Sequence, residues 1–141
     1  MDITSLLKKG CESLNIPITC KQLEKFQIYC DFLLEYNQNV NLTAITYPPE
    51  IVSKHFLDSI YPLAIDLIKP EKRCADVGTG AGFPGVPLAI MRPDLEFTLI
   101  DAQKKRLVFL EQLFKLAGIK NCTLLHSRAE DAGHSIREYF D

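Results

Sequence analysis

The chain has 141 residues, of which 47% are hydrophobic and 24% charged, so it can bury the core of one compact domain and is too short for two large ones. Its formal net charge is -2. This excludes a broadly basic protein that binds nucleic acid or anionic membranes through its overall field, and any contact with nucleic acid must come from a local patch.

The first part of the chain is predicted to be helical. Apolar side chains at helical spacing predict an amphipathic helix over residues 2–14. A second helix is predicted to begin at Thr19, because the pattern T-x-x-Q, completed by Gln22, is typical of a capping box that satisfies the free amides of a first turn. The apolar face of this second helix is typical of a helix that packs on a core.

A loop and a further helical stretch complete this N-terminal part. Residues 36–49 are uncharged, rich in Asn and Thr and closed by two prolines, which predicts a loop. Residues 50–68 have a helical pattern, and Pro62 is expected to kink or split the helix. We therefore expect a helical part over residues 1–69 ahead of any strand.

The pattern changes after Pro70, where short apolar strands alternate with helices. Strands are predicted over residues 74–78, 95–101 and 122–127, and helices over residues 86–91 and 103–117. Strands separated by helices of this length form right-handed crossovers and a parallel sheet. The expected fold class is therefore α/β, with the sheet in residues 70–141.

Four glycines follow the first predicted strand, in the sequence DVGTGAGFPG over residues 76–85. Glycine adopts positive φ angles and has no Cβ, so such a turn lets a ligand approach the main chain closely. We call residues 78–85 the glycine loop. Two registers fit it: G-x-G-x-x-G from Gly80 matches the dinucleotide fingerprint, and D-x-G-x-G-x-G from Asp76 matches the loop that holds S-adenosylmethionine in methyltransferases. The glycines alone do not decide between them.

Asp76 favours the methyltransferase register. A carboxylate at the end of the first strand would repel a pyrophosphate, whereas it can accept a hydrogen bond from the ammonium of a methionyl group, directly or through water. Pro84 also removes one backbone donor at the start of the next helix, where a phosphate needs free amides. The candidate cofactor-binding residues in this register are Asp76, Gly78, Gly80 and Gly82.

Acidic residues after the next two strands are further candidates. Asp101 ends the second strand, where an acidic residue is expected to accept hydrogen bonds from ribose hydroxyls. Its alternative role is that of N-cap for the helix that begins near Lys104. The segment SRAE over residues 127–130 follows the third strand and lines the same crevice of a parallel sheet, where Glu130 could meet the edge of an adenine.

With these motifs in view, the sequence resembles the bacterial 16S ribosomal RNA guanine-N7 methyltransferases, the glucose-inhibited division protein B family. The resemblance is carried by the loop DVGTGAGFPG and by four further segments in the family's order and spacing. These are NLTAI at residues 41–45, KHFLDS at 54–59, LIDAQKKR at 99–106 and SRAE at 127–130. It spans most of the chain.

The resemblance implies an S-adenosyl-L-methionine-dependent enzyme that methylates N7 of a guanine in the 530 loop of 16S ribosomal RNA. It implies a helical N-terminal part ahead of a Rossmann-like methyltransferase domain, with 16S ribosomal RNA or the small ribosomal subunit as partner. In that family the cofactor meets the positions that match Gly78, Phe83, Ala129 and Glu130.

Methyl transfer to N7 needs no general base, because the attacking lone pair carries no proton. No catalytic residue is therefore assigned, and catalysis is expected to rest on alignment of the reacting groups. N7 of a paired guanine lies in the deep groove of an A-form helix, so an unpaired target is expected. Candidate RNA contacts are Lys104, Lys105, Arg106 and Arg128, although adjacent basic residues on a helix are often only a solvated face.

Two features define the alternatives. Family members continue through further strands, whereas this chain is expected to hold only the first three, so the first strand should expose an edge through which the chain could self-associate. A fragment of this kind could be a non-catalytic cofactor- or RNA-binding module. The register from Gly80 keeps open a dinucleotide-dependent oxidoreductase, although no hydride-accepting site is found in the sequence.

The remaining reactive residues carry no recognisable site. The chain's five cysteines include no C-x-x-C pair and are expected to be reduced thiols. His55, His126 and His134 have no metal-ligand or triad spacing, so no metal is expected. The start of the chain lacks a targeting pattern and no segment is apolar enough to span a bilayer, so a cytoplasmic location is expected.

Overall fold

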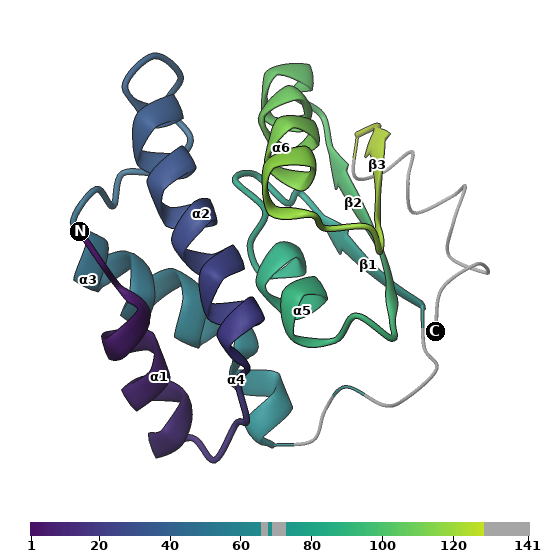
Figure 1. Ribbon diagram of the computed structural model, residues 1–141. Helices are drawn as coiled ribbons and strands as arrows, with labels where there is room; N and C mark the ends of the chain where they lie inside the picture. Colours follow the sequence, from purple (N-terminus) through teal and green to yellow (C-terminus); the bar gives the residue numbers. More distant parts are fainter. Residues whose placement is uncertain (66–67, 69–72, 129–141) are drawn as a thin grey trace.

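The computed structural model describes residues 1–65, 68 and 73–128. Five helical segments come first and an alternation of strands and helices follows (Figure 1). The N-terminal segments are α1 (Thr4–Ser13), α2 (Cys20–Asn37), α3 (Pro48–Glu50), the π-helix η1 (Ile51–Leu57) and α4 (Asp58–Ala64). They are followed by β1 (Arg73–Val77), α5 (Gly85–Met91), β2 (Glu96–Asp101), α6 (Lys104–Ala117) and β3 (Cys122–His126).

Local signals account for the start of α2 and the end of α6. The predicted capping box is confirmed, because the Thr19 hydroxyl accepts from the Gln22 amide at 3.2 Å and the Gln22 side chain accepts from the Thr19 amide at 2.9 Å. Gly118 ends α6 with a φ of +67°, a left-handed conformation that glycine adopts without steric cost.

Pro62 does not split the helix at its own position, because it lies inside α4. The predicted helical stretch is divided after Leu57 instead, where the π-helix η1, whose hydrogen bonds span five residues rather than four, passes into α4. A kink at Pro62 stays a prediction. The loop predicted over residues 36–49 is confirmed apart from its ends, which belong to α2 and α3.

The three strands form one parallel sheet in the order β1-β2-β3, which confirms the predicted α/β fold class in the described residues. Asp76 pairs in register with Leu99, and Asp101 pairs with His126. Helices α5 and α6 lie on one face of the sheet, between it and the N-terminal helices (Figure 1). The carboxyl ends of β1 and β2 thus lie side by side and bring Val77 and Asp101 to one edge.

A single core joins the N-terminal helices to the α5 and α6 layer. The rings of Phe32 on α2 and Phe109 on α6 stack with centroids 5.2 Å apart and an interplanar angle of 9°. Phe26 on α2 meets Phe56 of η1 at 4.9 Å. Such aromatic pairs contribute about 1 kcal/mol each beyond the burial of their area. The N-terminal helices are therefore packed on the sheet half, and the boundary near residue 69 remains a prediction.

The cysteines are simple structural residues. None of the five, all of which are among the described residues, forms a disulfide. Burial raises the pKa of the Cys11 and Cys30 thiols to about 11, and such thiols are poor nucleophiles. Across the described ranges, every helix is too short or too polar to cross a bilayer.

Candidate cofactor site

The glycine loop leaves the carboxyl end of β1 and is tied to β2 by its backbone. The amides of Gly78 and Thr79 donate to the carbonyl of Ile100 at 2.8 and 3.1 Å. The amides of Gly82 and Phe83 both donate to the carbonyl of Thr79, at 2.9 and 3.1 Å. These bonds close a tight turn before α5 begins at Gly85, and the Phe83–Pro84 peptide within it is cis.

The four glycines of the loop fall into two pairs. Gly78 and Gly80 have φ angles of +72° and +61°, and a Cβ built on either meets nothing within 4 Å. A Cβ at Gly82 would lie 2.6 Å from the Tyr29 hydroxyl, and one at Gly85 would lie 2.3 Å from Leu99 Cδ2. The first pair leaves the main chain open to a ligand, whereas the second pair is required by close packing.

Asp76 organises the loop from inside. Its Oδ2 accepts from the Thr79 hydroxyl at 2.7 Å and from the Gly85 amide at 3.0 Å. Burial raises the pKa of the Asp76 carboxyl above its ordinary value of 3.8, the two hydrogen bonds oppose this shift, and the charge of Asp101 adds to it. Oδ1 receives no hydrogen bond from the residues that the structure describes, and the side chain as a whole is partly buried.

The raised pKa gives a prediction for Asp76→Asn, which removes the ionisation but keeps an oxygen that can accept from Thr79 and Gly85. The folded chain holds the Asp76 proton to higher pH than the unfolded chain. The contribution of this proton to stability is therefore complete below pH 3.8 and is lost as the pH rises through the raised pKa.

Relative to the Asn variant, the unsubstituted chain should lose stability as the pH rises across this window, by at most about 1.4 kcal/mol per pH unit. Urea unfolding of both chains at a series of pH values measures the effect. A stability difference that does not change with pH would contradict the prediction.

Asp101 is more deeply buried than its predicted roles, ribose binding or an N-cap, require. Only 3% of it is exposed, and its oxygens accept from the Gly80 amide and the Gln103 amide, each at 2.8 Å. The N-cap of α6 is Gln103, and Asp101 lies two residues before it. Asp101 Oδ2 is also 3.5 Å from Arg106 Nη1. Asp101 thus joins the glycine loop to the start of α6, and a ribose would have to share these contacts.

Side chains from the N-terminal helices complete the support of the loop. The Tyr29 hydroxyl donates to the Ala81 carbonyl at 2.5 Å, and the Tyr29 ring stacks on Phe83 at 5.4 Å. His55 of η1 stacks on Phe83 at 4.2 Å. The sequence did not identify these contacts, although His55 belongs to the KHFLDS segment, because no local spacing links residues so far apart.

Comparisons with known proteins show the family of the chain. The family model described as rRNA small subunit methyltransferase G, GidB, matches residues 22–141. The chain belongs to this family. It is 47% identical over its whole length to the ribosomal RNA small subunit methyltransferase G of Clostridium perfringens strain 13, and covers 60% of that protein.

Relatives of the same name from other organisms give similar values. The chain is 45% identical to the protein of Alkaliphilus oremlandii, with 100% of this chain and 60% of the relative covered. It is 48% identical to that of Thermoanaerobacter sp. strain X514, with 96% of this chain and 58% of the relative covered. The chain thus spans about 60% of the length of the curated relatives that it matches.

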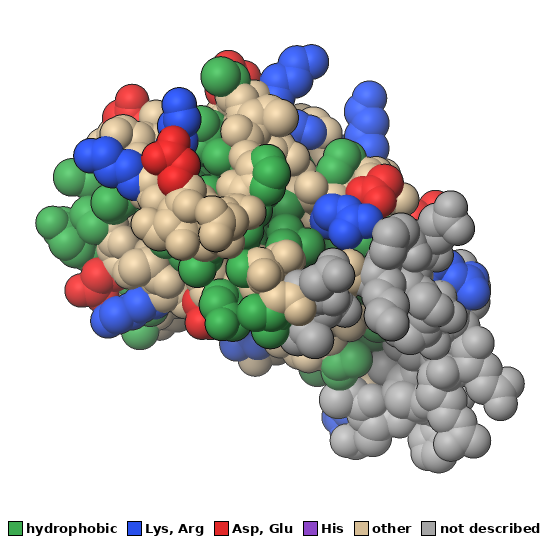
Figure 2. All heavy atoms as spheres, turned by 90° about the horizontal axis from the view of Figure 1, so that it is seen from below, with side chains coloured by type: hydrophobic (Ala, Val, Ile, Leu, Met, Phe, Trp, Pro, Cys, Tyr) green, Lys and Arg blue, Asp and Glu red, His purple; other side chains and the backbone are tan. Residues whose placement is uncertain are grey.

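The structure describes some, but not all, of the other residues predicted to bind the cofactor or RNA in this GidB family member. Ala129 and Glu130 lie outside the described residues. Lys104, Lys105 and Arg128 are exposed, whereas Arg106 turns inward to Asp101. On the face seen in Figure 2, Lys and Arg side chains are scattered among acidic ones and form no continuous basic field.

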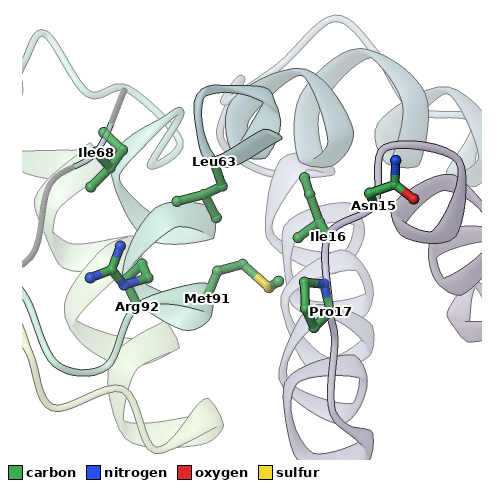
Figure 3. Close-up of a pocket in the computed structure, with 7 residues that line it drawn as sticks. All are labelled: Asn15, Ile16, Pro17, Leu63, Ile68, Met91 and Arg92. Atoms are coloured by element: carbon green, nitrogen blue, oxygen red, sulfur yellow. The ribbon is translucent and has the colours of Figure 1, made fainter. Parts of the chain in front are cut away.

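A cavity of about 340 Å³ lies at the other end of α5 (Figure 3). Its lining includes Ile16, Leu63, Met91 and Arg92. Met91 is the last residue of α5, whereas the glycine loop precedes its first. This cavity is therefore separate from the loop. In the described ranges, no three His, Cys, Asp or Glu side chains gather in a group that could hold a metal ion.

Proposed function

We propose that the protein takes part in S-adenosyl-L-methionine-dependent methylation of small-subunit ribosomal RNA. The observation that carries this proposal is the hydrogen bond of the Asp76 carboxylate, whose Oδ2 accepts from the first amide of α5, that of Gly85, at 3.0 Å. The names of the curated relatives supply the substrate class. N7 of a guanine in the 530 loop of 16S ribosomal RNA is the finer proposal, and such a substrate would place the protein in the cytoplasm.

The residues of the loop fit a zwitterionic ligand. The backbone at Gly78 and Gly80 faces open space, so a ligand can lie directly against it. An ammonium group that reaches Asp76 would be held by its carboxylate through a charge-assisted hydrogen bond. Asp101 would accept from a ribose only by sharing its contacts with Gly80 and Gln103. Contacts of the cofactor with Phe83, Ala129 and Glu130 remain proposals from the family resemblance.

A dinucleotide fits this loop poorly. In the G-x-G-x-x-G register the pyrophosphate needs the free amides at the start of the helix. Here the Gly85 amide is already bound to Asp76, and the carboxylate would repel a phosphate held beside it. The close packing of Gly85 on Leu99 matches the role of the third glycine in that fingerprint, but it serves a methyltransferase loop equally well.

The proposed reaction requires mainly that the chain's residues align the cofactor with the guanine. The cofactor, when bound, supplies a methyl group on a positively charged sulfur. The chain's residues would hold the cofactor against the Gly78–Gly80 backbone, and the guanine would have to lie outside a helical stack so that N7 can reach the site. Lys104, Lys105 and Arg128 are the exposed candidates to hold RNA phosphates. No side chain is needed to remove a proton before attack.

Calorimetric titration with S-adenosylhomocysteine and with NAD tests the proposal. We expect the chain to bind the former and not the latter. Asp76→Asn keeps the loop contacts but loses the charge that attracts the ammonium, so we expect it to bind about tenfold more weakly, which corresponds to about 1.4 kcal/mol. Binding of NAD alone would favour the oxidoreductase. Binding without methyl transfer to 16S ribosomal RNA would favour a non-catalytic binding module.

Self-association through β1 is a further proposal. Among the described strands β1 pairs only with β2, and Val77 on β1 is 47% exposed. The exposed Val77 end of β1 is where a strand of a second chain could pair. We expect light scattering to detect dimers or larger species as the concentration increases, and a monomer at all concentrations would contradict this.

A further inference from the structure

Two segments of the N-terminal part meet each other and the glycine loop at one point. The imidazole of His55, in η1, lies parallel to the Phe83 ring with an interplanar angle of 4° and a centroid distance of 4.2 Å. The Nε2 atom of His55 is 2.9 Å from the hydroxyl of Thr43. Thr43 belongs to the NLTAI segment and His55 to KHFLDS, and the site described above includes the stack of His55 on Phe83 but not the contact of His55 with Thr43.

Thr43 is held rigidly, so it can fix the imidazole. The side chain of Asn37, the last residue of α2, accepts from the Leu42 and Thr43 amides at 2.7 and 3.0 Å. The same side chain donates to the Thr43 carbonyl at 3.0 Å. The backbone on both sides of the Thr43 hydroxyl is therefore anchored to the end of α2.

The hydrogen bonds are compatible with a neutral ring. The Thr43 hydroxyl accepts from the Ile45 amide at 3.1 Å and still has its own proton to donate to Nε2. In that arrangement a neutral His55 carries its proton on Nδ1. Burial lowers the pKa of His55, and the Asp58 carboxylate opposes this shift. A neutral ring loses less on desolvation against the aromatic face of Phe83 than a charged ring would.

We propose that His55, oriented by Thr43, is a positioning residue that holds Phe83, and with it residues 82–84 of the glycine loop, in the arrangement to which the cofactor binds. The expected effect on cofactor binding rests on the proposed function, whereas the contacts of His55 with Thr43 and Phe83 do not. Phe83 also packs on Tyr29, whose hydroxyl binds the preceding Ala81 carbonyl. The loop is thus held at two neighbouring points by side chains from α2 and η1.

A matched set of variants separates the hydrogen bond from the volume of the side chains. Thr43→Val keeps the size but removes the hydroxyl, and Thr43→Ser keeps the hydroxyl. His55→Phe keeps the stacked ring but removes Nε2. Ser53→Ala, on the exposed side of the same π-helix, is the control that leaves the loop untouched. Melting temperature is recorded for every variant to verify folding.

Two readouts are measured on the full chain. The first is the affinity for S-adenosylhomocysteine, which we expect to fall about fivefold in His55→Phe, the effect of one lost hydrogen bond, and by at least as much in Thr43→Val, which also removes the acceptor of the Ile45 amide. The double variant should lose no more than Thr43→Val alone, because both substitutions remove the contact of Thr43 with Nε2. Thr43→Ser and Ser53→Ala should retain the full affinity, and equal affinity in all variants would overturn the proposal.

The second readout does not depend on the cofactor. Amide hydrogen exchange at Gly82 and Phe83, both bonded to the Thr79 carbonyl, should be about fivefold faster in Thr43→Val and His55→Phe than in Thr43→Ser. If the unsubstituted chain fails to bind S-adenosylhomocysteine while this difference is present, the proposed function fails and the positioning role stands. Equal exchange rates in all the variants would overturn the positioning role, whatever the cofactor result.

Discussion

Gly82→Ala is expected to lower the free energy of unfolding by about 3 kcal/mol or more and to abolish binding of the cofactor product. The φ angle of Gly82 is +104°, and the new Cβ would lie 2.6 Å from the Tyr29 hydroxyl and 2.7 Å from Val86 Cγ2. Backbone strain and overpacking therefore add. The methyl group would also push Tyr29 from the Ala81 carbonyl that it binds.

Gly118→Ala is the matched control for this substitution. Its φ angle of +67° imposes the same kind of backbone strain, but a Cβ there meets nothing within 4 Å. We expect it to cost only about 1 kcal/mol and to leave ligand binding unchanged. Urea unfolding and calorimetry measure both effects. Equal losses of stability in the two variants would show that packing against the loop contributes nothing.

Asp101→Ala is expected to cost about 3 kcal/mol of folding free energy. It would leave the amides of Gly80 and Gln103 without their acceptor and the half-buried guanidinium of Arg106 without its carboxylate. The Nε of Arg106 is already buried without a hydrogen-bond partner among the described residues. The substitution would also remove the carboxylate that pairs with the charge of this side chain.

A second ion pair on α6 provides the control. Lys115 and Glu111 are 3.7 Å apart with both side chains well exposed, so Glu111→Ala should change stability by less than about 0.5 kcal/mol. Adding Arg106→Met to Asp101→Ala should recover about 1 kcal/mol, because the uncompensated charge is then removed. Strictly additive losses in denaturant unfolding would contradict a direct interaction between Asp101 and Arg106.

The features that could be predicted from the sequence are those set within a few residues. The capping box at Thr19 and the C-cap at Gly118 depend on adjacent residues, and the strand and helix alternation follows from local periodicity. The split expected at Pro62 lies upstream instead, at the end of a π-helical stretch that has no simple sequence signal.

The candidate site was predictable in its chain positions and not in its contacts. The spacing of Asp76 and the glycines was visible and left two registers open. The hydrogen bond from the Gly85 amide to Asp76, which favours the methyltransferase register, could not be predicted from that spacing. Asp101 could be placed at the end of a strand, whereas its inward contact with Arg106 depends on how α6 packs. The stack of His55 on Phe83 joins residues 28 positions apart and has no local signature.

The continuous core has a consequence for how ligand binding can be observed. Because α2 packs on α6 through Phe32 and Phe109 and reaches the glycine loop through Tyr29, the helices and the sheet are expected to unfold together. A ligand that binds only the folded loop then stabilises the whole unit by mass action, by about 2.7 kcal/mol when it is present at about 100 times its dissociation constant. An unfolding transition followed by circular dichroism, to which the N-terminal helices contribute although they need not touch the ligand, should therefore shift when the loop is occupied.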